Sequence, residues 1–138
     1  MSTVRTIARL SRLLEHAGTD LTLPQFRLLA MVARGDERAT ALAGRLSLSK
    51  PTITAAVDGL VERGLVARAV VVGDRRAVNI QITDAGRFSL EAAEGRMAER
   101  IQPVIDRCAD PTAVTAAMEQ LDRALDQVMA ERRMESAR

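Results

Sequence analysis

The sequence predicts a mainly α-helical chain with one small β-hairpin. Residues 65–72 and 77–82 have the β-branched residues and the period-two alternation of short strands, and Gly73 with Asp74 supplies the turn chemistry between them. Just before the hairpin, residues 40–63 show a helix, a short turn and a second helix. Paired helices followed by a basic hairpin are the order of a winged helix-turn-helix domain.

Length and composition limit how many domains the chain can form. Its 138 residues, 47% of them hydrophobic, are enough for one core but few for two independent domains. We therefore expect a winged helix-turn-helix domain over residues 21–83. Residues 1–20 and 84–138 are expected to form a helical dimerisation region.

Two helices are expected before the helix-turn-helix. The first covers residues 2–16, carries an apolar stripe and ends at Gly18. The second begins at Thr22, whose hydroxyl and the side chain of Gln25 can form a capping box. We expect Gly35 to close this second helix.

The helix-turn-helix itself is predicted from caps and apolar spacing. A third helix over residues 40–46 is followed by a turn at Ser47 and Leu48, and Ser49 caps a fourth helix. The buried face of this fourth helix is expected to contain Ile53, Val57, Leu60 and Val61. Rotation by about 100° per residue places other side chains outward. These are Pro51, Ala55, Asp58 and Glu62, flanked by Thr52 and Thr54.

Two further helices follow the hairpin. Thr83 caps a helix over residues 84–107, which Pro103 should kink or split, and Asp110 caps a last helix that begins at Pro111. Apolar positions in the first are Phe88, Met97, Ile101, Val104, Ile105 and Cys108. The last helix has an apolar stripe of Val114, Ala117, Met118, Leu121, Leu125, Val128 and Met129.

Positive charge is concentrated in the helix-turn-helix and hairpin. Residues 38–76 contain seven basic and three acidic side chains, a net charge of +4, although the whole chain is only +2. Such a concentration is typical of a nucleic-acid-binding surface. For Arg75 and Arg76 alone, the alternative is a solvated hairpin whose charges keep a sheet edge soluble.

The sequence excludes several classes of function. With His16 as the one histidine and Cys108 as the one cysteine, no Ser–His–Asp or Cys–His site can form, nor can a Cys/His zinc site. No glycine-rich phosphate loop follows a strand. We therefore expect no enzymatic activity, no metal and no cofactor. Cys108 is expected to be a buried packing residue or a passive interface thiol rather than a redox sensor.

Other patterns limit the partners and the location. Two phenylalanines, Phe26 and Phe88, are the only aromatic residues, which argues against a stacking platform for single-stranded nucleic acid. No apolar stretch approaches the length of a membrane span, and no signal-peptide core follows the N-terminus. We expect a cytoplasmic protein that does not contact a membrane.

The outward face of the fourth helix is suited to the major groove of duplex DNA. In a helix-turn-helix, the N-terminal residues of the second helix meet base edges. Here Lys50 can reach a phosphate or a guanine, and Pro51 and Ala55 can contact thymine methyl groups. The hydroxyls of Thr52 and Thr54 can bond to base edges or phosphates. At the hairpin tip, Arg75 and Arg76 are suited to a narrow minor groove.

These residues resemble a known family. LSKPTITAAVDGLVERGLVAR from Leu48, GDRR from Gly73 and IQITDAG from Ile80 are similar to the MarR family of bacterial transcriptional regulators. LTLPQF from Leu21 matches the family's usual entry to its second helix. The resemblance covers nearly the whole chain, and the segment from Asp74 to the TDAG motif is its most specific part.

The resemblance implies a homodimer in which the first, fifth and sixth helices of both chains pack together. The two winged domains would then meet a pseudo-palindromic operator in double-stranded DNA. The resemblance also implies that Arg76 enters the minor groove and that Asp74 orients the wing. In this family, small ligands or oxidants often relieve repression by respacing the two recognition helices.

The effector expected on this basis is an apolar or aromatic acid. It would bind in the crevice between the dimerisation layer and the winged domain, with Arg12 and Arg87 as candidate carboxylate partners. The predicted function is thus a dimeric, ligand-responsive repressor. The alternative is a winged-helix protein whose hairpin and basic face contact other proteins and which has no operator.

Overall fold

The chain forms two compact units, Met1–Arg100 and Ile101–Arg138. A computed structural model describes residues 2–35, 37–38, 41, 46, 48–71 and 73–136. None of the helices in this described part is long and apolar enough to cross a membrane.

The first unit begins with helices α1 (Thr3–Glu15) and α2 (Leu23–Val32). The capping box predicted for α2 is confirmed: the Gln25 amide donates to Thr22 Oγ1 at 3.2 Å, and the Thr22 amide donates to Gln25 Oε1 at 3.1 Å. These two bonds satisfy amides that lack partners at a helix start.

The predicted end of α2 at Gly35 is wrong. The helix ends at Val32, because the next amides bond three rather than four residues back, Arg34 to Met31 O and Gly35 to Val32 O. Such tightening of the last turn is common at helix ends. Ala33 is the C-cap of α2, and its amide is the last one that donates to a carbonyl four residues back, Leu29 O.

The second helix of the helix-turn-helix is α4 (Lys50–Glu62). Its predicted cap is confirmed, since the Thr52 amide donates to Ser49 Oγ at 3.3 Å. The predicted helix over residues 40–46 lies outside the described residues except for Ala41 and Leu46, which are both helical. The side chains of α4 that are buried are Ile53, Ala56, Val57 and Leu60.

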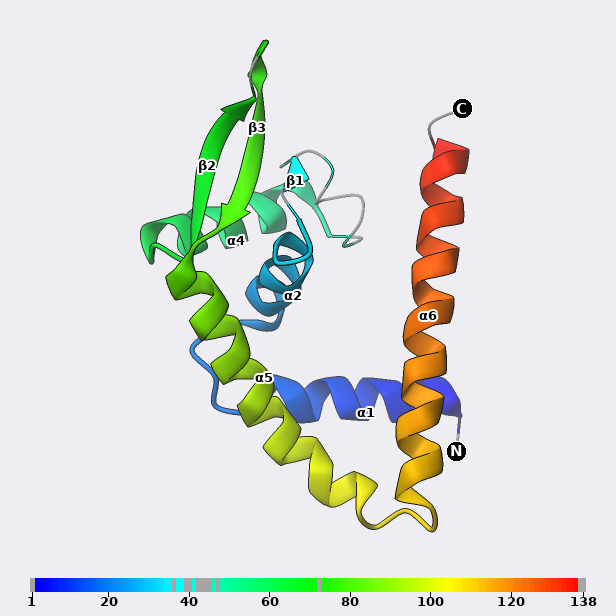
Figure 1. Cartoon of the computed structure of the whole chain (residues 1–138). Helices are drawn as coiled ribbons and strands as arrows, with labels where there is room; N and C mark the ends of the chain where they lie inside the picture. Colours follow the sequence, from blue (N-terminus) through cyan, green and yellow to red (C-terminus); the bar gives the residue numbers. More distant parts are fainter. Residues whose placement is uncertain are drawn as a thin grey trace. The chain divides into compact units, whose positions relative to one another are not determined.

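The predicted hairpin is present as strands β2 (Val66–Val71) and β3 (Asp74–Ile82). A third strand, β1 (Glu37–Arg38), pairs antiparallel with the other edge of β3, so the sheet order is β1-β3-β2. A two-residue strand is too short to show a periodicity, and it was not predicted from the sequence. In Figure 1 the β2–β3 hairpin projects away from α2 and α4.

The start predicted for the second strand, at residue 77, is wrong. Val70 pairs with Val78, but the next residue, Val71, pairs with Asp74, so residues 75–77 have no counterpart on β2. This bulge interrupts the alternation that marked the strand in the sequence, although β3 itself continues to Asp74. The turn before it contains Gly73 with φ of 87°, a conformation that favours glycine.

The core of the first unit lies where α2, α4 and the sheet meet helix α5 (Asp84–Ile105). Its most buried large side chains are Leu28, Leu29, Val32, Leu60 and Ile80. From α5, the core includes Leu90 and Ala93.

Phe88, expected as an apolar position of α5, is instead 76% exposed. Gly86, Leu90, Ala93 and Met97 form the buried stripe of this helix. At about 100° per residue, position 88 lies nearly opposite that stripe. The apolar pattern alone therefore did not predict which face of α5 is buried.

At Gly86, the first turn of α5 packs closely against the backbone of Leu65. A Cβ at this position would lie 2.0 Å from the carbonyl oxygen of Leu65. Thr83 caps the helix as predicted, accepting from the Gly86 amide at 3.0 Å and donating to Gly64 O at 2.6 Å. These contacts join the start of α5 to the segment that follows α4.

The second unit contains the end of α5 and helix α6 (Pro111–Ser136). The predicted cap of α6 is confirmed, because the Ala113 amide donates to Asp110 Oδ1 at 2.9 Å. Pro103 does not split α5, which continues to Ile105. Cys108 is partly exposed, so burial in the chain's own core, one of its two expected roles, is wrong.

Candidate nucleic-acid interface

The five residues predicted to contact DNA from α4 all lie exposed at the N-terminal half of that helix. They are Lys50, Pro51, Thr52, Thr54 and Ala55. Their exposure follows from the opposite side of the helix, where Ile53 and Val57 are 4% and 3% exposed. The structure thus brings these predicted residues together on one small, solvent-facing surface, which we call the α4 face.

The two threonines of the α4 face differ in their hydrogen bonds. Thr52 Oγ1 lies 2.8 Å from Ser49 Oγ, so this hydroxyl is part of the helix cap. Within the described residues, the hydroxyl of Thr54 has no such partner. Thr54 is therefore better placed than Thr52 to bond to a base edge.

A concave surface of about 520 Å³ adjoins the α4 face, between the first turns of α2 and α4. From α4 it includes Pro51, Thr52 and Ala55. The other side is formed by Thr22, Pro24 and Gln25. Of these, Thr22 and Gln25 were predicted only as the start of a helix. Their one signal in the sequence is the capping box, which shows where α2 begins. It does not show which residues lie beside that helix start.

Of the basic residues between positions 38 and 76 whose side chains the structure describes, two are engaged within the fold. Arg68 on β2 forms an ion pair with Asp58 on α4. The Arg63 guanidinium donates to Asp20 O at 2.7 Å. Both arginines connect structural elements, and less of the charge excess is free for phosphates than the residue count indicated. Lys50 remains exposed at the start of α4.

The other basic residues of this region have side chains outside the described part. These are Arg38, Arg45, Arg75 and Arg76; the side chain of Asp74 also lies outside it. The backbone places Asp74 at the start of β3, with Arg75 and Arg76 in the bulge beside the turn. Bulges next to functional sites commonly redirect side chains.

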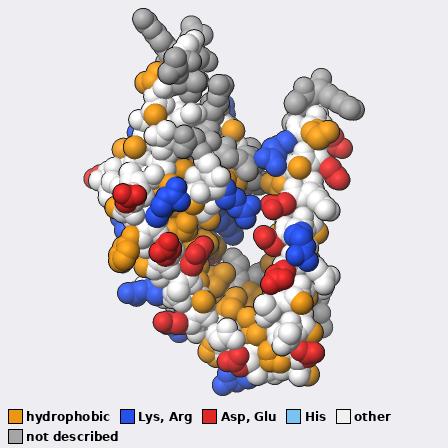
Figure 2. Space-filling model, in the orientation of Figure 1, with side chains coloured by type: hydrophobic (Ala, Val, Ile, Leu, Met, Phe, Trp, Pro, Cys, Tyr) orange, Lys and Arg blue, Asp and Glu red, His pale blue; other side chains and the backbone are white. Residues whose placement is uncertain are grey.

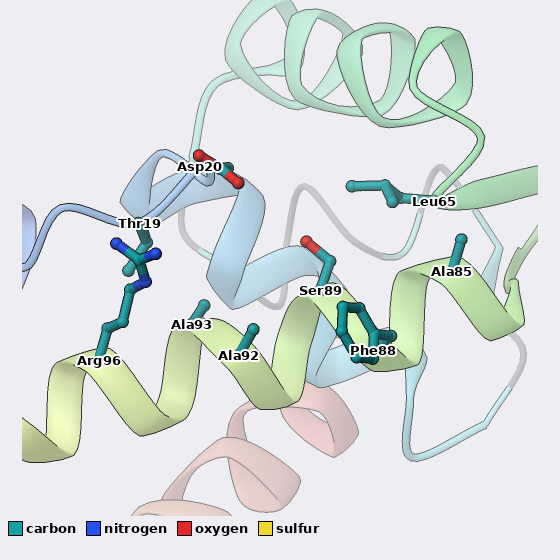
Figure 3. Close-up of a pocket in the computed structure, with 9 residues that line it drawn as sticks. All are labelled: Thr19, Asp20, Leu65, Ala85, Phe88, Ser89, Ala92, Ala93 and Arg96. Atoms are coloured by element: carbon teal, nitrogen blue, oxygen red, sulfur yellow. The ribbon is translucent and has the colours of Figure 1, made fainter.

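The residues proposed for effector binding do not line the cavity that lies beside the loop between α1 and α2. Arg12 and Arg87 are both exposed, and neither lines the cavity of about 510 Å³ between α5 and the loop that joins α1 to α2. The basic residue that does line this cavity is Arg96, which points toward Thr19 in that loop (Figure 3). No local motif in the sequence marks Arg96.

Comparison with known proteins connects this geometry to a family. Residues 19–77 match the model of the MarR family. The chain is 29% identical over 107 residues to the HTH-type transcriptional repressor YetL of Bacillus subtilis, covering 74% of this chain and 64% of that protein. It is 32% identical over 96 residues to the HTH-type transcriptional regulator PecS of Dickeya dadantii, covering 62% and 58%. The chain therefore spans less than two thirds of the length of either relative.

The fold is similar to that of a solved repressor. CouR from Rhodococcus jostii RHA1, in its structure bound to a 23-mer DNA duplex, matches with a TM-score of 0.73 and 26% identity. The match covers 88% of this chain and 87% of that one. CouR has also been solved bound to p-coumaroyl-CoA.

Proposed function

Because the chain belongs to the MarR family of winged helix-turn-helix transcriptional regulators, we propose that it binds double-stranded DNA as a homodimer and regulates transcription at a pseudo-palindromic operator. The observation that carries this proposal is the exposed α4 face, held outward by a fully buried opposite side. The likeness to CouR bound to duplex DNA supports it. The family is non-enzymatic, and such a regulator would act in the cytoplasm, where bacterial operators are found.

The α4 face has the chemistry that major-groove binding requires. Apart from Lys50, its side chains are small, so the helix can approach base edges closely. The positive end of the helix dipole lies at the same end as Lys50. Thr54 supplies a hydroxyl for a base edge, and Ala55 supplies a methyl group for contact with thymine. These side chains would distinguish sequences, while Lys50 would bind a phosphate or a guanine.

The hairpin would contact the adjacent minor groove. In this proposal Arg76 enters the groove, Arg75 lies against a phosphate and Asp74 orients the tip. The bulge of residues 75–77 supports this assignment, because it alters the course of the strand where the two arginines lie.

Exposed apolar side chains on the terminal helices support the homodimer. On α1, Val4 and Ile7 are 73% and 57% exposed, and α6 exposes Met118, Leu121, Leu125 and Val128. Figure 2 shows apolar side chains between charged ones along α6 on the face that is drawn. Helices with an apolar stripe gain stability when a partner covers it. A second copy of the chain is the partner proposed here.

Leu121→Glu should convert the dimer to a monomer. The substitution places a charge in the centre of the apolar stripe of α6, and we expect the dimer dissociation constant to rise about a hundredfold or more. Sedimentation across a range of protein concentrations measures it. Ala116→Glu adds the same charge on the opposite side of the helix and should leave the dimer intact. Equal effects of the two substitutions would show that this stripe is not the interface.

Arg76→Ala tests the DNA-binding function directly. A duplex selected by the wild-type protein from random DNA should lose about 1–3 kcal/mol of binding free energy, the scale of one specific arginine contact. Fluorescence anisotropy measures the affinity, and circular dichroism checks that the variant folds. Arg75→Ala should have a smaller effect that diminishes as salt is added, since phosphate contacts are screened.

Two results would contradict the proposal. Unchanged affinity of Arg76→Ala would remove the hairpin from the interface. Failure of the wild-type protein to select any duplex, at low as well as moderate salt, would favour the alternative of a winged-helix module that binds proteins.

Release by a small ligand is the finer part of the proposal. The effector we propose is a small acid with an apolar or aromatic body, in keeping with the interdomain crevices that ligands prefer. Arg12 and Arg87 remain proposed partners of its carboxylate, although both are exposed on the described chain.

A further inference from the structure

The cavity beside the loop between α1 and α2 lies wholly within the first unit. Its volume of about 510 Å³ is in the range of roughly 300–1,000 Å³ that is usual for small-molecule sites. One wall is the N-terminal half of α5, and the loop residues Thr19 and Asp20 form another (Figure 3). Leu65, just before β2, approaches from the side opposite to α5.

Two ionic groups of opposite sign line this cavity. Arg96 donates from Nη1 to Gly18 O at 2.7 Å, and no carboxylate of the described residues pairs with its guanidinium. Asp20 likewise has no cationic partner for its carboxylate in the described part of the chain. A simple anion would be attracted by Arg96 but repelled by Asp20. A zwitterion satisfies both groups with charge-assisted hydrogen bonds.

Apart from the hydroxyl residues Thr19 and Ser89, the rest of the cavity lining is apolar. The ring of Phe88, 76% exposed, lies on the cavity side of α5 together with Ala85 and Ala92. An aromatic side chain this exposed gains most from a flat apolar partner, because offset or edge-to-face ring contacts add to the burial of area. Ser89 adds one hydroxyl among these apolar groups.

We propose that this cavity binds a free α-amino acid with an aromatic side chain. The ligand's carboxylate binds Arg96, its ammonium group binds Asp20, and its ring packs against Phe88. This assignment is independent of Arg12 and Arg87, and its recognition chemistry requires both charges of the ligand.

The same loop connects the cavity to the helix that faces DNA. Arg96 holds the loop at Gly18 O, and Arg63, the C-cap residue of α4, holds it at Asp20 O. A ligand carboxylate competes with Gly18 O for the Arg96 guanidinium, so binding loosens the loop that supports the end of α4. We expect the amino acid to lower the affinity for DNA, and bound DNA to lower the affinity for the amino acid by the same factor. This coupling rests on the proposed function, whereas the site itself does not.

Calorimetric titration of the free protein tests the site. L-Phenylalanine should bind at least about tenfold more tightly than 3-phenylpropionate, which lacks the ammonium group, or phenethylamine, which lacks the carboxylate. Asp20→Asn should remove the preference over 3-phenylpropionate, and Arg96→Gln the preference over phenethylamine. Arg100→Gln, one turn along α5 and outside the cavity lining, is the matched control and should bind as the wild type does.

A second variant guards against a folding defect, because Arg96 also holds the loop. Phe88→Ala removes an exposed ring and should leave the thermal midpoint unchanged while weakening L-phenylalanine binding. Equal binding of L-phenylalanine and 3-phenylpropionate by the wild type would overturn the zwitterion site. Absence of L-phenylalanine binding by the wild type would overturn it as well. If, in that case, Phe88→Ala also shifted sedimentation toward the monomer, the cavity would be covered by a second copy of the chain.

The coupling has its own test. L-Phenylalanine should reduce wild-type affinity for the selected duplex, and Arg63→Gln should bind the amino acid as tightly as wild type but respond less in DNA binding. Equal responses of the two proteins would overturn the loop coupling. Intact amino acid binding by a protein that binds no duplex would contradict the proposed function and leave the site standing.

Discussion

Gly86→Ala should destabilise the protein by about 3 kcal/mol or more, an unusually large cost for adding one methyl group. The Cβ would lie 2.0 Å from Leu65 O and 2.8 Å from Ile82 Cγ1. The Leu65 oxygen cannot move freely, because it accepts a hydrogen bond from the Thr83 amide at 3.1 Å. Either α5 or the segment from Leu65 into β2 must shift, and both contain core residues.

Gly95→Ala is the matched control on the same helix. A Cβ at position 95 meets nothing within 4 Å, so only the backbone preference acts. Alanine favours a helix over glycine by about 0.5–1 kcal/mol, and this variant should be slightly stabilised. Urea unfolding at fixed protein concentration measures both, since the stability of a dimer depends on concentration. If Gly86→Ala were as stable as wild type, the close approach of α5 to Leu65 would be wrong.

Ala55→Asp should abolish specific DNA binding without unfolding the protein. Ala55 lies on the exposed α4 face, where a carboxylate has full access to water in the free protein. In the proposed complex the same carboxylate would face base edges and phosphates. We expect a loss of about 3 kcal/mol in affinity for the selected duplex, measured by anisotropy at several salt concentrations.

Val57→Asp places the same charge two residues further along α4, with the opposite consequence. Val57 is 3% exposed and belongs to the main core. An unpaired carboxylate there should cost about 4 kcal/mol or more, enough to unfold a domain of ordinary stability. Circular dichroism separates the two variants. A folded Val57→Asp protein, or an Ala55→Asp protein that binds DNA normally, would mean that the faces of α4 are reversed.

Where the sequence analysis was right, the interactions involved are local. The caps at Thr22, Ser49 and Asp110 bond to amides three residues away, so their residue types alone predict the helix starts. The two faces of α4 follow from the helical repeat, because Ile53, Val57 and Leu60 recur at the spacing of one buried side. These short-range rules already placed the α4 face, from Lys50 to Ala55, on the outside.

Where it was wrong or incomplete, residues distant in the sequence decide the outcome. The rotation of α5 depends on Gly86 meeting the carbonyl of Leu65, and this contact places Leu90 rather than Phe88 in the core. Strand β1 exists only because Glu37 can pair with Ile80, already held in the sheet. Neither effect leaves a periodic signal in its own segment.

The sequence by itself therefore determined the family resemblance, the helix caps at Thr22, Ser49, Thr83 and Asp110, and the residues of α4 that face outward. Only the tertiary structure decided which side of α5 is buried, how the bulge at residues 75–77 forms, and which arginines are engaged within the fold. Arg63 and Arg96 reach loop carbonyls 43 and 78 positions away along the chain. Hydrogen bonds over such separations depend on how the packed elements bring a side chain next to a distant carbonyl. Local residue preferences do not predict that placement.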